Sequence, residues 1–111
     1  MSLSTHVLDT SRGRPAAGMR VVCERRVDGG WQRLAEHVTD DDGRIADLVG
    51  PGALHGGVHR LLFATGDWAV ERGERCFWPE VVVVFEVSDP GEHHHVPLLY
   101  SPFGYSTYRG S

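Results

Sequence analysis

Residues 93–111 read HHHVPLLYSPFGYSTYRGS and predict two extended segments joined by a turn. Successive side chains of a strand point to opposite faces, so the first segment is expected to have one face with His93, His95 and Pro97 and another with His94, Val96 and Leu98. Ser101-Pro102 favours a turn, because proline fixes the backbone angle φ. Most chain ends fray, but this aromatic, strand-like end is expected to be held against the domain.

Six further strands are predicted upstream from alternating or continuously apolar runs, at residues 3–9, 19–27, 32–39, 44–49, 58–64 and 80–87. Residues 80–87 are apolar on both faces and are expected to form a central strand. Asp28-Gly29-Gly30 predicts a tight hairpin, and the stretch 11–18 predicts a loop. One short helix is expected at 66–73, with Asp67 as its N-cap and Gly73 at its end. Eight short strands and a minor helix predict an all-β sandwich.

The composition is that of one small globular domain spanning 1–111, with a net charge of −4 and no lysine. Its arginines are scattered, which argues against nucleic acid as a partner. Cys23 and Cys76 are expected to be core thiols and not a bridge. No signal segment is recognisable, and no apolar run approaches the ~20 residues of a membrane helix. These features predict a soluble cytoplasmic protein without a membrane partner.

Several motifs resemble the transthyretin-like family and, within it, the 5-hydroxyisourate hydrolases. The longest is HVPLLYSPFGYSTYRGS, from His95 to Ser111. Shorter ones are STHVLDT at 4–10, GRPA at 13–16, the stretch 39–44, FATGDW at 63–68 and FWPEV at 77–81. The resemblance implies a Greek-key β-sandwich of two four-stranded sheets with one short helix. It also implies a homotetramer, a dimer of dimers, with active sites in the grooves where dimers meet.

The same resemblance implies that His6, Arg44 and His95 are catalytic. The family's reaction opens the six-membered ring of 5-hydroxyisourate by hydrolysis, giving 2-oxo-4-hydroxy-4-carboxy-5-ureidoimidazoline in urate degradation. Such a reaction needs a base for water, an acid for the leaving nitrogen and a cation for the developing oxyanion. Imidazoles suit the first two roles and a guanidinium the third. The final Tyr108, Arg109, Gly110 and Ser111 are expected to bind the substrate.

Other side chains offer weaker chemistry, and no cofactor or metal is expected. His93 and His95 share a strand face and, with His6 as a third ligand, form an alternative zinc site, but no cysteine pair or carboxylate stands at ligand spacing. A serine nucleophile is disfavoured because the G-x-S-x-G elbow is absent. The run 40–43 is expected to be a solvated turn and not a calcium loop. His37, His55 and His59 are expected to be structural, at the surface or partly buried, and His93 and His94 are equally well explained as solvated strand residues.

Three classes of function follow from these observations: a ring-opening hydrolase, a transthyretin-like carrier of small molecules, and a β-sandwich interaction domain. The family resemblance places the histidine and arginine set and the Tyr-Arg-Gly-Ser end in the hydrolase branch and not in the carrier branch. The interaction domain leaves that set unexplained. The hydrolase is therefore the favoured hypothesis, and which histidine acts as the base stays open.

Overall fold

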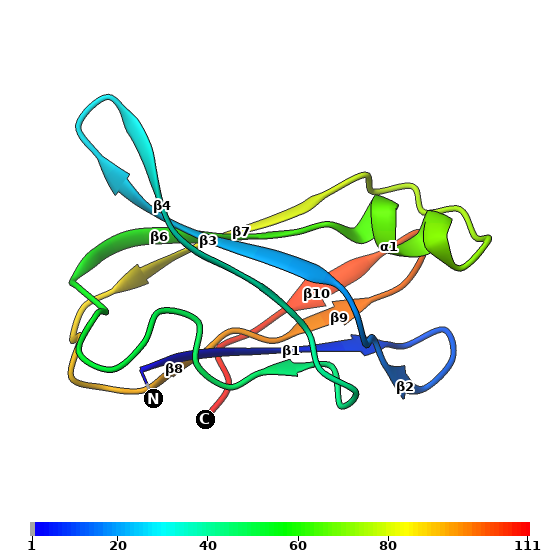
Figure 1. The fold of residues 1–111 in the computed structure, drawn as a ribbon, viewed down its shortest axis with the longest axis horizontal. Coiled ribbons are helices and arrows are strands. Elements are labelled where there is room, and N and C mark those ends of the chain that lie inside the picture. Colours follow the sequence, from blue (N-terminus) through cyan, green and yellow to red (C-terminus); the bar gives the residue numbers. More distant parts are fainter. Residues whose placement is uncertain (1) are drawn as a thin grey trace.

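The computed structural model describes residues 2–111 and forms two β-sheets packed face to face, with one short helix at an end of the sandwich (Figure 1). The four-stranded sheet has the order β4 (Gly30–Val38), β3 (Arg20–Val27), β6 (Gly57–Phe63) and β7 (Val81–Val87). The other sheet contains β1 (Leu3–Asp9), β2 (Arg14–Pro15), β5 (Arg44–Ile45), β8 (His94–His95), β9 (Leu98–Tyr100) and β10 (Tyr105–Thr107). The predicted all-β sandwich with one short helix is confirmed.

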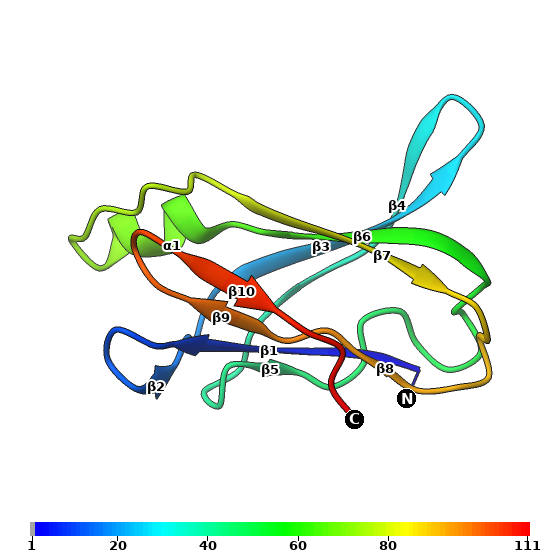
Figure 2. The ribbon, with the colours of Figure 1, turned by 180° about the vertical axis from the view of Figure 1, so that it is seen from behind.

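Strand β1 joins distant parts of the chain in the second sheet (Figure 2). Strands β8 and β9 run parallel to it, and β2 and β5 run antiparallel to it. The segment that makes β8 and β9 is interrupted at Val96-Pro97, where proline has no N–H for a ladder bond. That interruption, together with the two-residue strand β2, is why this sheet counts six strands where the family resemblance implies four.

Apolar side chains on the facing surfaces of the two sheets form the core. Its largest fully buried side chains include Leu3, Met19, Leu48, Leu61, Phe63, Leu98 and Tyr100. The inward face predicted for the C-terminal segment is confirmed, because His94, Val96 and Leu98 are buried, but Pro97 of the opposite face is buried as well. The buried Cys23 and the half-buried Cys76 are free thiols, as predicted. Among residues 2–111, no helix is long and apolar enough to cross a membrane.

Helix α1 (Thr65–Glu71) follows β6 and covers one end of the core. Trp68 anchors it: its indole Nε1 donates to the carbonyl oxygen of Ala17 at 2.8 Å, and its ring meets Tyr100 edge to face. Gly73 ends the helix as predicted, with φ of 70° and its N–H donating to Val70. The predicted cap is wrong, because Ala64 occupies the N-cap position without a side-chain hydrogen bond and Asp67 lies in the first turn.

Two other predictions about strands are corrected by the structure. Strand β7 lies at the edge of its sheet and not at the centre, although both of its faces are apolar. Its outward side chains Val82 and Val84 are 38% and 53% exposed. Burial within this chain therefore does not explain why the outward face of β7 is apolar. The stretch 11–18 is mostly turn but contains β2, and the predicted strand 44–49 is regular only over β5.

Candidate active site

Strand register gathers the predicted catalytic residues on the outer face of the β1 sheet. Leu3, Thr5 and Val7 of β1 point into the core, so Ser4 and His6 point away from it. His6 lies directly opposite Arg44 of β5, and Ser4 lies directly opposite His95 of β8. Side chains at directly opposed positions of two neighbouring strands lie on the same face of the sheet. His6, Arg44 and His95 are therefore neighbours, although they are far apart in the sequence.

The turn before β5 sets the position of Arg44. One carboxylate oxygen of Asp40 accepts the backbone N–H groups of Asp42 and Arg44, each at 2.9 Å. Gly43 has φ of 75°, and a β-carbon there would lie 2.4 Å from the carbonyl oxygen of Val7. Glycine is thus required both for the backbone angle and for the close approach to β1. The acidic run 40–43 forms a turn that delivers Arg44 to the site.

His95 is held on three sides. Its Nδ1 lies 2.8 Å from the hydroxyl oxygen of Ser4, and its carbonyl oxygen accepts the N–H of Gly110 at 2.8 Å. The next residue, Val96, donates its N–H to Ser4 and accepts the hydroxyl of Thr5. These contacts fix the backbone and one ring nitrogen of His95. The other ring nitrogen, Nε2, is left for a molecule bound at the outer face.

The surroundings of His95 favour its neutral form. Burial lowers its pKa below the usual value, because an imidazolium loses hydration there. Positive charge on His6, His93 and Arg44 lowers the pKa further, while a hydrogen bond with the backbone of Ser4 acts in the opposite direction. A neutral imidazole at neutral pH carries a lone pair that can accept a proton, which is the requirement for a general base.

A hollow of about 230 Å³ lies over this cluster, and we call it the histidine hollow. It is lined by Ser4, Thr5, Arg44, Ile45, Ala46, His93, His95 and Ser111. His6 stands beside it in register with Arg44. The hollow therefore combines a guanidinium, imidazoles and hydroxyls, which are the groups needed to activate water and to stabilise an oxyanion.

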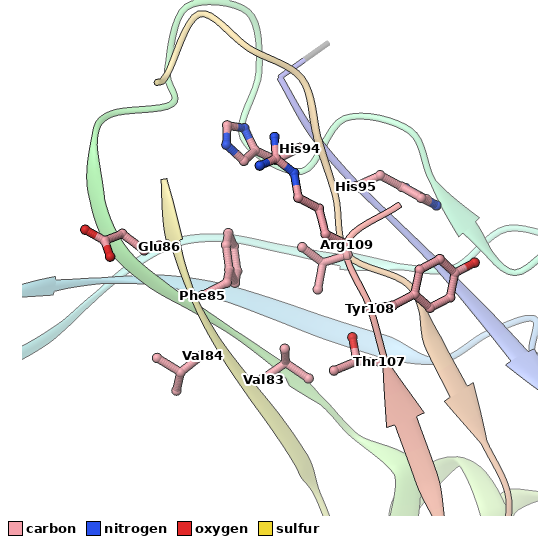
Figure 3. Close-up of a pocket in the computed structure, with 10 residues that line it drawn as sticks. Val83, Val84, Phe85, Glu86, His94, His95, Thr107, Tyr108 and Arg109 are labelled. Atoms are coloured by element: carbon pink, nitrogen blue, oxygen red, sulfur yellow. The ribbon is translucent and has the colours of Figure 1, made fainter. Parts of the chain in front are cut away.

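A second hollow of about 230 Å³, the edge hollow, opens between β7 and the end of the chain (Figure 3). Its walls are Val83, Val84, Phe85, Glu86, His94, His95, Val96, Thr107, Tyr108 and Arg109. In Figure 3 the His95 ring points away from β7. The predicted substrate-binding residues are thus divided: Tyr108 and Arg109 line the edge hollow, Ser111 lines the histidine hollow, and Gly110 packs against His95. Arg109 also pairs with Glu92.

The other histidines differ from expectation in two cases. His94 is 5% exposed and points into the core opposite Leu3, so its assignment as a solvated residue is wrong. His59 is fully buried, stacks on Phe85 and bonds the carbonyl oxygen of Gly57. Within residues 2–111, no group of three or more His, Cys, Asp or Glu side chains is arranged to hold a metal ion.

Sequence reasoning assigned no role to Ser4, which contacts both His93 and His95. The signal was present in the strand alternation, because Ser4 stands two residues before His6 and so shares its face. Its partners on β8 lie about ninety residues away, and the parallel register that brings them together has no local sequence signature.

Known proteins resemble this chain both in sequence and in fold. Residues 3–110 match the HIUase/Transthyretin family. A 5-hydroxyisourate hydrolase of Caulobacter vibrioides is 48% identical over 113 residues, covering 98% of this chain and 97% of the relative. The structure of Klebsiella pneumoniae 5-hydroxyisourate hydrolase has a TM-score of 0.87 at 39% identity, covering 100% of both chains. Sea bream transthyretin in complex with thyroxine has a TM-score of 0.92 at 31% identity, covering 99% of this chain and 95% of that one.

The same fold thus carries a hydrolase in one of these proteins and a bound hormone in another, so the fold by itself does not separate the two functions. Membership of the family is shown by the family match itself, which leaves out only two residues at the start of the chain and one at the end. The protein belongs to the HIUase/transthyretin family.

Proposed function

We propose that this protein hydrolyses 5-hydroxyisourate to 2-oxo-4-hydroxy-4-carboxy-5-ureidoimidazoline, a step of urate degradation. The observation that carries the proposal is the register of β1, which has His6 opposite Arg44 and Ser4 opposite His95 on one exposed face. The relatives named as 5-hydroxyisourate hydrolases support the same assignment. A cytoplasmic location is part of the proposal.

The proposed chemistry needs no covalent intermediate with the enzyme. One imidazole takes a proton from water as its oxygen attacks the ring carbonyl carbon, and the carbonyl oxygen becomes an oxyanion. Arg44 stabilises that charge through its planar fork of N–H donors. The C–N bond then breaks, and the leaving nitrogen takes a proton from the second imidazole. His6 and His95 supply the two imidazoles, and the lowered pKa of His95 suits it to the role of base.

Substrate binding is assigned to Tyr108, Arg109, Gly110 and Ser111. Ser111 stands at the histidine hollow with Arg44 and His95, and its hydroxyl is suited to hydrogen bonding with a polar ring. Tyr108 is 56% exposed beside the edge hollow, where its ring can stack on a flat ligand. The packing of Gly110 on His95 keeps these two ends of the segment on either side of the imidazole.

We also propose a homotetramer, a dimer of dimers. Strands β7 and β10 are the edges of their sheets, and unpaired strand edges are templates for another chain. Apolar side chains are exposed on or near these edges: Val82, Val84, Phe77, Phe103 and Tyr105. Packing against a partner chain explains why the outer face of β7 is apolar, which burial within one chain does not explain. A second copy over the outer face of the β1 sheet encloses the histidine hollow.

A carrier without catalysis is the alternative, and the likeness to transthyretin in complex with thyroxine favours it as the second candidate. A carrier site is mostly apolar. The histidine hollow instead brings together a guanidinium and imidazoles. Covering these groups with an apolar ligand costs part of their hydration free energy and gives no polar contact in return. This difference favours the hydrolase.

The test is an assay in which 5-hydroxyisourate is generated from urate in situ and its ultraviolet decay is followed with and without the protein. The hydrolase predicts decay that accelerates in proportion to protein concentration, and His95→Ala abolishes most of the acceleration. Decay at the uncatalysed rate over a range of protein concentrations, with binding detected by calorimetry, identifies the carrier instead.

A further inference from the structure

Ser4 joins two histidines on the outer face of the β1 sheet. Its hydroxyl oxygen lies 3.1 Å from Nε2 of His93 and 2.8 Å from Nδ1 of His95. Ser4 is 8% exposed and is held opposite His95 by the β1–β8 register. A hydroxyl has one proton, so it donates to one of the two ring nitrogens and accepts from the other. The tautomers of the two histidines are therefore linked through Ser4.

We propose that Ser4 is a positioning residue that fixes the tautomer of His95. The inference rests on the proposed hydrolase, in which His95 is the base. In the resting arrangement His95 carries its proton on Nδ1 and donates it to Ser4, and Ser4 donates its own proton to Nε2 of His93. This arrangement leaves the lone pair on Nε2 of His95 facing the histidine hollow.

The proton transfers balance as follows. Nε2 of His95 takes a proton from the attacking water while the new C–O bond forms, and Nδ1 of His95 keeps its proton, which it donates to Ser4. The leaving nitrogen takes a proton from His6 as the C–N bond breaks. His95 then releases one proton to solvent and His6 takes one up, so both rings return to their resting forms.

The charges around His95 show which form of the ring Ser4 has to position. An imidazolium at His95 faces His6 on β1, Arg44 on β5 and His93 in its own segment, and burial disfavours its charge. Arg109, in the segment that packs on His95, is also positive, although it pairs with Glu92. The neutral ring is therefore favoured, and its tautomer decides whether the lone pair lies on Nε2.

The kinetic test compares Ser4→Ala, Ser4→Thr, His93→Gln and the double variant Ser4→Ala/His93→Gln. Ser4→Ala is expected to lower kcat by about 10-fold with little change in KM, the range found when a group that orients a functional histidine is removed. Ser4→Thr keeps the hydroxyl and restores the rate. Because the two residues act in series, the double variant loses no more than Ser4→Ala alone. Ser106→Ala, which removes an exposed hydroxyl from the same sheet, is the matched control.

A spectroscopic test needs no turnover. The ¹⁵N shifts of the His95 ring in the wild type report one tautomer, with the proton on Nδ1, and Ser4→Thr retains it. Ser4→Ala is expected to give a mixture of tautomers with an unchanged melting temperature. A wild-type ring protonated on Nε2, wild-type kcat in Ser4→Ala, or additive losses in the double variant overturns the positioning role. Absence of hydrolysis by the wild type overturns the proposed function itself, so the two failures are distinguishable.

Discussion

Gly110 packs directly against the imidazole of His95. A β-carbon at Gly110 would lie 2.4 Å from Cδ2 of His95 and 3.1 Å from Cγ, closer than non-bonded carbons approach. The backbone reinforces the contact, because the N–H of Gly110 donates to the carbonyl oxygen of His95. The C-terminal segment thus forms a wall that sets the position of the His95 ring.

The change Gly110→Ala is therefore expected to displace His95 or the C-terminal segment. A misplacement of about 1 Å in a catalytic group is enough to cost ~10²-fold in rate. We expect kcat/KM to fall by about that factor while the melting temperature stays close to the wild-type value, since the segment lies outside the core. Gly104→Ala is the matched control, because its β-carbon meets only the Ser101 hydroxyl, at 3.7 Å. Equal rates for both variants contradict the packing role.

Single replacement of His6, Arg44 or His95 by alanine is expected to lower kcat by ~10²–10⁴-fold, since each is proposed to supply an acid, base or oxyanion-stabilising group. All three side chains lie on the outer face of the sheet and contribute little to the core. Circular dichroism should therefore remain that of the wild type. A folded variant with a near-native rate would remove that residue from the mechanism.

Local sequence patterns predicted most of the strands, but not their neighbours. The alternation in the C-terminal segment correctly identified His94, Val96 and Leu98 as inward side chains. Whether a strand is central or at an edge is decided by the pairing of distant segments, so the apolar run of β7 was misjudged. The site shows the same division: His6, Arg44 and His95 were named through the family resemblance, whereas Ser4 became visible only through the parallel pairing of β1 with β8.

His59 predicts how stability depends on pH. Its ring is fully buried, and burial lowers its pKa, with positive charge from Arg25, His55 and His94 acting in the same direction and a hydrogen bond to Gly57 opposing. An unfolded histidine takes up a proton near pH 6.5, roughly its unperturbed pKa. The folded state resists that proton, so stability is fully present above that pH and is lost as pH falls below it. One such group contributes a slope of at most about 1.4 kcal/mol per pH unit.

The change His59→Gln removes this titration and is expected to flatten the fall in unfolding free energy between about pH 6.5 and pH 5. Part of the slope remains, because the pKa of His95 is also lowered. Chemical denaturation at several pH values measures the effect. His37→Gln, which removes an exposed histidine whose ring bonds the carbonyl oxygen of Leu48, is the matched control. Identical slopes for His59→Gln and the wild type contradict the prediction.

Removal of metal ions tests the alternative use of His93 and His95 as zinc ligands. The mechanism proposed above supplies its base, acid and oxyanion stabilisation from side chains, so activity is expected to survive exhaustive dialysis against a strong chelator. The rate before and after dialysis is the measurement. Loss of activity that stoichiometric zinc restores would reassign these two histidines to a metal site.

Deletion of residues 108–111 is the last test, because it separates the proposed substrate-binding segment from the fold. The core strands lie upstream, and Tyr108, Arg109 and Ser111 are exposed, so the shortened chain is expected to fold. It loses the wall against His95, the Ser111 hydroxyl and the Tyr108 ring together, and kcat/KM should fall by at least ~10²-fold. Ser111→Ala removes a single hydroxyl and is expected to lose less, mainly through KM. Normal turnover by a folded, shortened chain would show that the substrate is held elsewhere.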